Sequence, residues 1–156
     1  FDGMEIRYEI EVARPPEAVF DFLVDTDSFA VVDRSLVSIE PSGVMRVGLH
    51  GTFVHRRRGM TARSRWEVTE LERPSRIRVA IRGMGYEMNE SATLSSTGSG
   101  TLATFVDAVR PTSLAGRLMV ALSGGTMRRD LDQRARLLKA ALEADVAHQD
   151  RPRPNA

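Results

Sequence analysis

Four polar side chains, His55, Tyr86, Glu90 and Asp107, occupy positions from which they could do acid–base chemistry or hold a ligand. Each lies in a segment that alternates polar and apolar residues, and Asp107 follows Phe105 by two positions. Because successive side chains of a strand point to opposite faces, an inward Phe105 implies an inward Asp107. Apolar cavities with a few convergent polar groups are the usual form of small-molecule sites. The pattern therefore predicts a ligand cavity with these four groups in its wall.

Catalysis by these groups is one of three interpretations. Cyclase or dehydratase chemistry on a β-keto substrate needs a base within hydrogen-bond reach of an acidic carbon or hydroxyl. His55, acting with Glu90 or Asp107, is the candidate catalytic set. The same residues could instead line a binding cavity without catalysing, or pair structurally with an arginine or a tyrosine. A bulge in a strand would turn any of them to solvent.

Several other chemistries are excluded by the residues present. The chain has no cysteine and three histidines, of which His50 and His55 have opposite strand parity, so we expect no metal site. The glycine turn at 98–103 lacks the third glycine of a dinucleotide-binding loop and joins two predicted strands. No G-x-S-x-G pattern marks a nucleophilic serine. We expect no cofactor.

Strand parity and helical spacing extend the predicted cavity wall to apolar side chains. The full set of predicted ligand-binding residues is Phe53, His55, Trp66, Val79, Ile81, Tyr86, Met88, Glu90, Phe105, Asp107, Leu118 and Leu122. A hydrophobic small molecule is the partner that such a wall predicts.

Arginines of outward strand parity form a second feature. The predicted anion or partner patch comprises Arg56, Arg58, Arg63, Arg65, Arg78 and Arg82, with Arg76 beside them. Such a patch could bind peripherally to a membrane surface or to an acidic protein. Alternatively, it could be a solvated strand face without a partner. No aromatic residues alternate with these arginines, which argues against single-stranded nucleic acid, and we expect a nucleic-acid partner to be unlikely. The formal net charge of +1 indicates no strong overall preference.

The elements that must position these residues follow from periodicity and turn residues. Residues 4–13 alternate as a half-buried strand, and Pro15 and Pro16 suit the first turn of a helix that follows. Asp25 or Asp27 would cap a second short helix. Six further strands are predicted at 36–40, 49–58, 61–71, 76–82, 86–95 and 101–109.

After Pro111 the pattern becomes helical. Leu114, Leu118 and Leu122 form one apolar stripe, and a second stripe of Leu131, Ala135, Leu138 and Leu142 follows Gly124 and Gly125, which should kink or interrupt the helix. We expect both stripes to face the concave side of a curled antiparallel sheet. The predicted fold class is α+β.

At 156 residues the chain has the size of one domain. We expect residues 1–3 to be a remnant of an upstream sequence, residues 4–146 to form the ligand-binding domain, and residues 147–156 to be a disordered polar tail. The absence of cysteine and of a long apolar segment favours a cytoplasmic protein. We expect it to be a monomer or a homodimer.

Motifs along nearly the whole chain resemble the START-like (Bet v 1-like, SRPBCC, helix-grip) superfamily, in particular its bacterial polyketide cyclase/dehydrase and lipid-transport branch. They are "ARPPEAVFDFLVD" at 13–25, Gly48, "WEVTELERPSRIRV" at 66–79, "GSGT" at 98–101 and "RRDLDQRARLLKAALE" at 128–143. One departure is the lack of a tryptophan after the second helix, where Val31 and Val32 stand.

The resemblance implies a helix-grip fold, in which a curved sheet of about seven strands wraps around a long C-terminal helix. It also implies a cavity for a hydrophobic or amphipathic molecule. The predicted function is binding of a lipid- or polyketide-like molecule, as carrier or sensor. A cofactor-independent cyclase/dehydratase-like enzyme is the alternative. An interaction protein, toxin-like or membrane-associated, acting through the arginines is the third.

Overall fold

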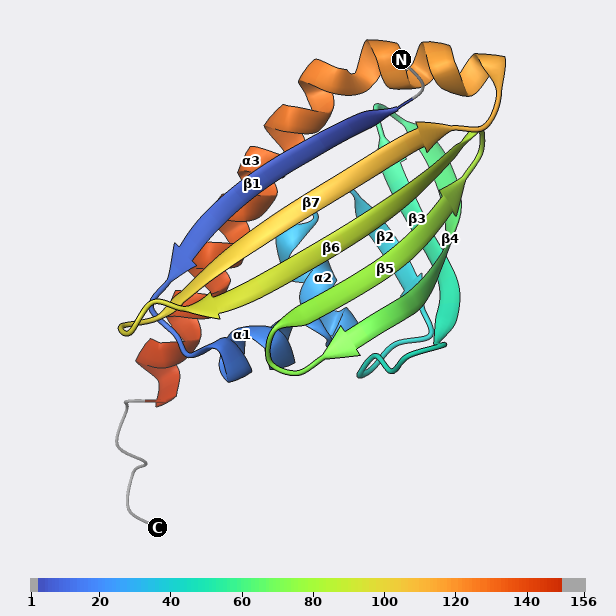
Figure 1. Ribbon diagram of the computed structural model, residues 1–156. Coiled ribbons are helices and arrows are strands. Elements are labelled where there is room, and N and C mark those ends of the chain that lie inside the picture. The colour runs from blue at the N-terminus through green and yellow to red at the C-terminus, as the bar shows by residue number, and fades with distance from the viewer. Residues whose placement is uncertain (1–2, 150–156) are drawn as a thin grey trace.

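A computed structural model describes residues 3–149 as a curved sheet held against a long helix (Figure 1). The elements follow in the predicted order, a strand, two short helices, six strands and a long helix. Their bounds are β1 Met4–Val12, α1 Pro16–Leu23, α2 Thr26–Val32, β2 Leu36–Glu40, β3 His50–Arg57, β4 Met60–Glu72, β5 Arg76–Gly83, β6 Tyr86–Ser96, β7 Thr101–Pro111 and α3 Leu114–Gln149. The predicted α+β class is confirmed.

All neighbouring strands are antiparallel, in the order β1-β7-β6-β5-β4-β3-β2. Register shifts occur between Leu36 and Ser38 in β2 and between Val68 and Glu70 in β4. Such irregularities bend a strand and increase its twist, which helps the sheet to curl. No bulge interrupts β6 or β7, so the inward parity of both strands holds over their full length.

The two short helices begin as the sequence predicts. Pro15 is the N-cap residue of α1 and Pro16 its first helical residue. The Asp25 side chain caps α2 by accepting a hydrogen bond from the backbone N–H of Asp27 at 3.0 Å. The helices close one end of the curled sheet, where Val19 and Phe20 are buried.

Helix α3 divides into a buried and an exposed half. Leu131, Leu138 and Leu142 are buried, as predicted. The prediction that Leu114, Leu118 and Leu122 pack against the sheet is wrong, because they are 82%, 63% and 75% exposed.

The exposure has a simple cause in the packing of the first turns of α3. The helix starts beside the β5–β6 turn, where a Cβ on Gly116 would lie 1.8 Å from the Gly85 carbonyl oxygen. This contact turns the opposite, leucine-bearing side outward. We expected a kink or an interruption at Gly124 and Gly125. The helix is continuous there, so it is not interrupted, and Figure 1 shows that α3 is bent along its length.

The C-terminal end of α3 lies beyond the residue at which we expected the domain to end. Helix α3 continues to Gln149, whereas we expected the domain to end at 146. The rest of the predicted tail lies outside the described residues. Among the helices described, none is long and apolar enough to cross a bilayer.

Candidate functional site

A cavity of about 570 Å³ lies between the open end of the sheet and α3. Its apolar wall includes Phe29, Phe53, Ile81, Met88, Val109, Met127 and Leu131. A smaller pocket of about 80 Å³ adjoins it deeper in the fold, since Phe29, Glu90, Asp107 and Arg134 line both. The larger volume lies within the range of about 300–1,000 Å³ that small-molecule sites occupy.

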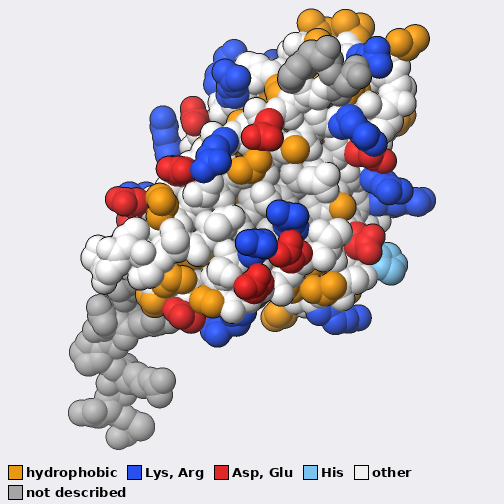
Figure 2. Space-filling view, viewed as in Figure 1, with side chains coloured by type: hydrophobic (Ala, Val, Ile, Leu, Met, Phe, Trp, Pro, Cys, Tyr) orange, Lys and Arg blue, Asp and Glu red, His pale blue; other side chains and the backbone are white. Residues whose placement is uncertain are grey.

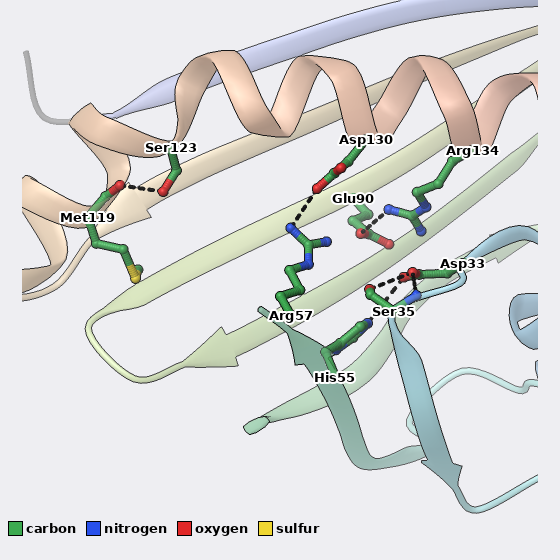
Figure 3. A network of polar contacts seen from close by, with 9 residues as sticks. All are labelled: Asp33, Ser35, His55, Arg57, Glu90, Met119, Ser123, Asp130 and Arg134. Atoms are coloured by element: carbon green, nitrogen blue, oxygen red, sulfur yellow. Dashed lines mark hydrogen bonds and ion pairs between the residues drawn. The ribbon is translucent and has the colours of Figure 1, made fainter. Parts of the chain in front are cut away.

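Two carboxylates face this space from neighbouring strands. Glu90 on β6 and Asp107 on β7 are directly opposite in the register, which brings their side chains together on the concave face. Arg134 on α3 reaches the pair, and its Nη1 lies 4.0 Å from the Glu90 Oε1 (Figure 3). One guanidinium therefore faces two acidic groups, of which Asp107 is buried.

Asp107 is the acidic group most affected by this environment. Burial raises the pKa of Asp107 to about 7, and the negative charge of Glu90 adds to the rise while Arg134 opposes it. Near neutral pH, Asp107 therefore carries a proton in part of the molecules and can donate a hydrogen bond. Tyr8 stacks on Phe105 at a centroid distance of 4.8 Å, and burial raises the pKa of its hydroxyl. Tyr8 is thus a neutral member of the same cluster.

A histidine–aspartate pair forms a second polar cluster in the cavity wall. The His55 Nε2 on β3 lies 3.2 Å from the Asp33 Oδ2, just after α2. The Asp33 Oδ1 accepts hydrogen bonds from the Ser35 backbone N–H at 2.9 Å and from its hydroxyl at 2.6 Å. These contacts fix the carboxylate and the ring against each other (Figure 3). The acidic partner of His55 is therefore Asp33, and not Glu90 or Asp107 as we expected.

The pKa of Asp33 reflects these contacts. Burial acts to raise it, but the hydrogen bonds from His55 and Ser35, together with nearby Arg134, hold the pKa well below its usual range.

We expect Asp33→Asn to lower the free energy of unfolding by about 2 kcal/mol at pH 7, because the lost hydrogen bonds involve a charged acceptor. A carboxyl group whose pKa is lowered by folding stabilises the protein above its unfolded-state pKa of about 4. This stabilisation is lost as the pH falls from that value through the folded-state pKa. Urea unfolding at pH 7 and at low pH measures the difference between wild type and variant. A difference that does not shrink at low pH would show that the charge is not its source.

The rim of the cavity carries two arginines, Arg57 and Arg58, of which sequence parity misplaced Arg58. Arg57 at the end of β3 binds Asp130 of α3 across the opening, with Nη1 and Oδ2 2.8 Å apart (Figure 3). Arg58 was predicted on the outer face of a strand. It lies instead in the β3–β4 turn with φ 49°, and it lines the cavity. Turn residues do not follow strand parity, which explains the error.

Most of the predicted ligand-binding residues lie in the walls of these two spaces. They are Phe53, His55, Ile81, Tyr86, Met88, Glu90, Asp107 and Leu122 in the larger cavity, and Val79 and Phe105 in the smaller pocket. Trp66 and Leu118 line neither the larger cavity nor the smaller pocket, so the prediction that they bind the ligand is corrected. Trp66 lies behind Phe53, with ring centroids 5.6 Å apart, and Leu118 faces solvent.

Three polar residues of the site were missed from the sequence. Arg134 lies between Leu131 and Leu138 on the buried stripe, and Tyr8 shares parity with Ile10, so both could have been assigned from spacing. Asp33 follows α2 and has no periodic signal. Only the pairing of β2 with β3 brings it to His55.

The outer-face arginines are partly neutralised. Arg56, Arg63, Arg65, Arg78 and Arg82 are exposed, as predicted. Glu70 lies 3.1 Å from Arg76 and 3.2 Å from Arg78, and Glu87 lies 3.7 Å from Arg82.

Among the described residues, no group of three or more potential ligands could hold a metal ion.

Comparisons with known proteins agree with this architecture. Residues 4–143 match the family described as polyketide cyclase / dehydrase and lipid transport. No curated protein matches the chain.

Solved structures with the same fold come from different sources. TTHA0849 from Thermus thermophilus has a TM-score of 0.72 at 21% identity, covering 91% of this chain and 99% of that one. CV1439 from Chromobacterium violaceum has a TM-score of 0.71 at 20% identity, covering 89% and 96%. DynU16, from the dynemicin biosynthetic locus, has a TM-score of 0.58 at 19% identity, covering 88% of this chain and 48% of that one.

Proposed function

Since the chain belongs to the polyketide cyclase / dehydrase and lipid transport family and has its helix-grip fold, we propose that it binds a lipid- or polyketide-like molecule as a carrier or sensor. The observation that carries this proposal is the cavity of about 570 Å³, which combines an apolar wall with a few polar groups. An apolar chain would contact Ile81, Met88 and Val109, while a polar group would reach the deeper cluster.

The charges around the cavity favour a ligand whose buried polar group is neutral. Asp33, Glu90 and Asp107 all interact with the buried guanidinium of Arg134, whereas Arg57 and Arg58 lie at the rim of the cavity. A ligand carboxylate placed there would add a negative charge to this group and be repelled. A carbonyl or hydroxyl oxygen can instead accept hydrogen bonds from Arg134 and from protonated Asp107.

We expect Met88→Trp to weaken binding of the neutral fluorescent probe N-phenyl-1-naphthylamine by about tenfold or more, which corresponds to about 1.4 kcal/mol. Met88 lines the cavity between Ile81 and Val109 on the neighbouring strands, so a larger ring there fills the space that the probe needs. Fluorescence titration gives both dissociation constants.

The matched control is Val47→Trp, which adds the same ring at an exposed position outside the cavity and should bind like wild type. In competition at pH 8, a medium-chain alkanol should displace the probe at lower concentration than the alkanoate of the same length. Equal binding by both tryptophan variants would place the probe outside the cavity. Stronger displacement by the alkanoate would contradict a neutral buried group.

A second candidate function is acid–base catalysis, and the Asp33–His55 pair is the observation that favours it. Asp33 holds the Nε2 side of the ring, which leaves Nδ1 as the nitrogen that can take a proton from a ligand. Protonated Asp107 in the same cavity could donate to a carbonyl oxygen. DynU16, which shares the fold, is a protein of a biosynthetic locus. A base at His55 and a hydrogen-bond donor at Asp107 are the two groups that an enzyme acting on a ketone would use.

A further inference from the structure

Large apolar side chains are exposed together at the open end of the cavity. The leucines Leu114, Leu118 and Leu122 of α3 are joined by Met60 and Met84, which are 75% and 91% exposed. We call these five residues the mouth surface. Figure 2 shows hydrophobic side chains gathered at the end of the molecule where α3 begins. A contiguous exposed apolar surface commonly marks a site of association.

Contacts of the backbone bring the mouth surface together from three segments. The Thr112 backbone N–H donates to the Gly85 carbonyl at 2.8 Å, which places the turn that carries Met84 beside the start of α3. Met60 and Leu122 line the same cavity. The mouth surface therefore adjoins the cavity at Met60 and Leu122.

The charge around the mouth surface is positive. The β3–β4 segment contributes Arg56, Arg57 and Arg58, and residues 114–129 contribute Arg117, Arg128 and Arg129 without any Asp or Glu. The acids next to these segments are bound to arginine, Asp130 to Arg57 at 2.8 Å and Glu87 to Arg110 at 3.1 Å. Acidic side chains are thus absent from residues 56–60 and 114–129, and Asp130 and Glu87 are paired.

We propose that the mouth surface docks peripherally on an anionic lipid bilayer, with its leucines and methionines in the acyl boundary and the arginines at the headgroups. Exposed aliphatic side chains beside an excess of cations are the combination that anionic leaflets attract. A nucleic acid would use the arginines but not the leucines. Docking would bring the cavity opening to the bilayer, where an apolar molecule could enter without crossing water.

This inference does not rest on the proposed ligand. Wild type should co-sediment with vesicles of phosphatidylcholine and phosphatidylglycerol, and much less with phosphatidylcholine alone. Leu118→Glu should lower the partition coefficient on the anionic vesicles by about tenfold, because it removes buried apolar area and adds a repelled charge. Leu118 is exposed and lines neither cavity, so the variant should keep the melting temperature and the N-phenyl-1-naphthylamine affinity of wild type.

The matched control is Val47→Glu, at a position 59% exposed in the loop between β2 and β3, which should bind vesicles like wild type. Arg129→Glu should weaken binding, and Arg46→Glu in the same control loop should not. Absence of vesicle binding, or equal loss in Leu118→Glu and Val47→Glu, would overturn the proposal. So would a concentration-dependent dimer that Leu118→Glu abolishes, or binding to DNA that Leu118→Glu leaves intact while vesicles are not bound.

Discussion

Asp107→Asn is expected to raise the free energy of unfolding by about 4 kcal/mol at pH 8 and to change it little at pH 4, at about 1.36 kcal/mol per pKa unit. The pKa of Asp107 is about 7 in the folded protein, against an ordinary value of 3.8. A carboxyl whose pKa is raised by folding contributes stability below its unfolded pKa and loses it as the pH rises through the folded value. Asparagine has the same shape and no charge, so the loss should disappear in the variant.

Thermal unfolding at pH 4, 6 and 8 measures this effect, with an expected increase in melting temperature of about 10 °C at pH 8. Asp132→Asn is the control, because Asp132 is an exposed aspartate of α3. Glu90→Gln should reduce the pH dependence of the wild type, since the charge of Glu90 contributes to the raised pKa of Asp107. An Asp107→Asn variant that is destabilised at pH 8 would contradict a buried, unfavourably charged carboxylate.

The fold was predictable because each element carries a local signal. Alternation identified the strands, Pro16 and Asp25 marked the helix starts, and inward Asp107 followed from Phe105 on an uninterrupted β7. Parity fails where the chain leaves the strand. Arg58 shows this, since one residue in a turn is enough to point it into the cavity opening.

The composition of the site was less predictable, because its pairs join residues far apart in the sequence. Asp33 and His55 meet only through the register of β2 and β3, which no local pattern specifies. The exposed leucines of α3 show a different limit. Helical spacing identifies an apolar stripe but does not say whether anything covers it. Leu118 is exposed because Gly116, on the opposite side of α3, is the residue that packs against the β5–β6 turn.

If the cavity is catalytic, His55→Gln should slow α-proton exchange of a bound ketone by about 100-fold, within the range of a general base. In this step the Nδ1 of His55 takes the proton from the carbon next to the carbonyl. The electron pair of the broken C–H bond moves to form the enol, and Asp107 gives a proton to its oxygen. After His55 has exchanged its proton with solvent, it returns a deuteron to the carbon while the enol hydroxyl returns its proton to Asp107, which restores the ketone and both side chains. Asp33→Asn should slow the exchange by about tenfold, since the ring loses the carboxylate that orients it and stabilises its charge.

The exchange is followed by NMR in deuterated buffer, with a neutral, medium-chain, α-methylated β-ketoester as the probe. Binding of N-phenyl-1-naphthylamine should be unchanged in His55→Gln, which separates a catalytic role from a role in shaping the cavity. His50→Gln is the matched control, because His50 is exposed and bonds to the Gly48 carbonyl at 3.2 Å away from the cavity. Exchange no faster with wild type than with His55→Gln would overturn the enzyme hypothesis. The Asp33–His55 pair would then serve to hold β3 against the segment after α2, and the cavity would act by binding alone.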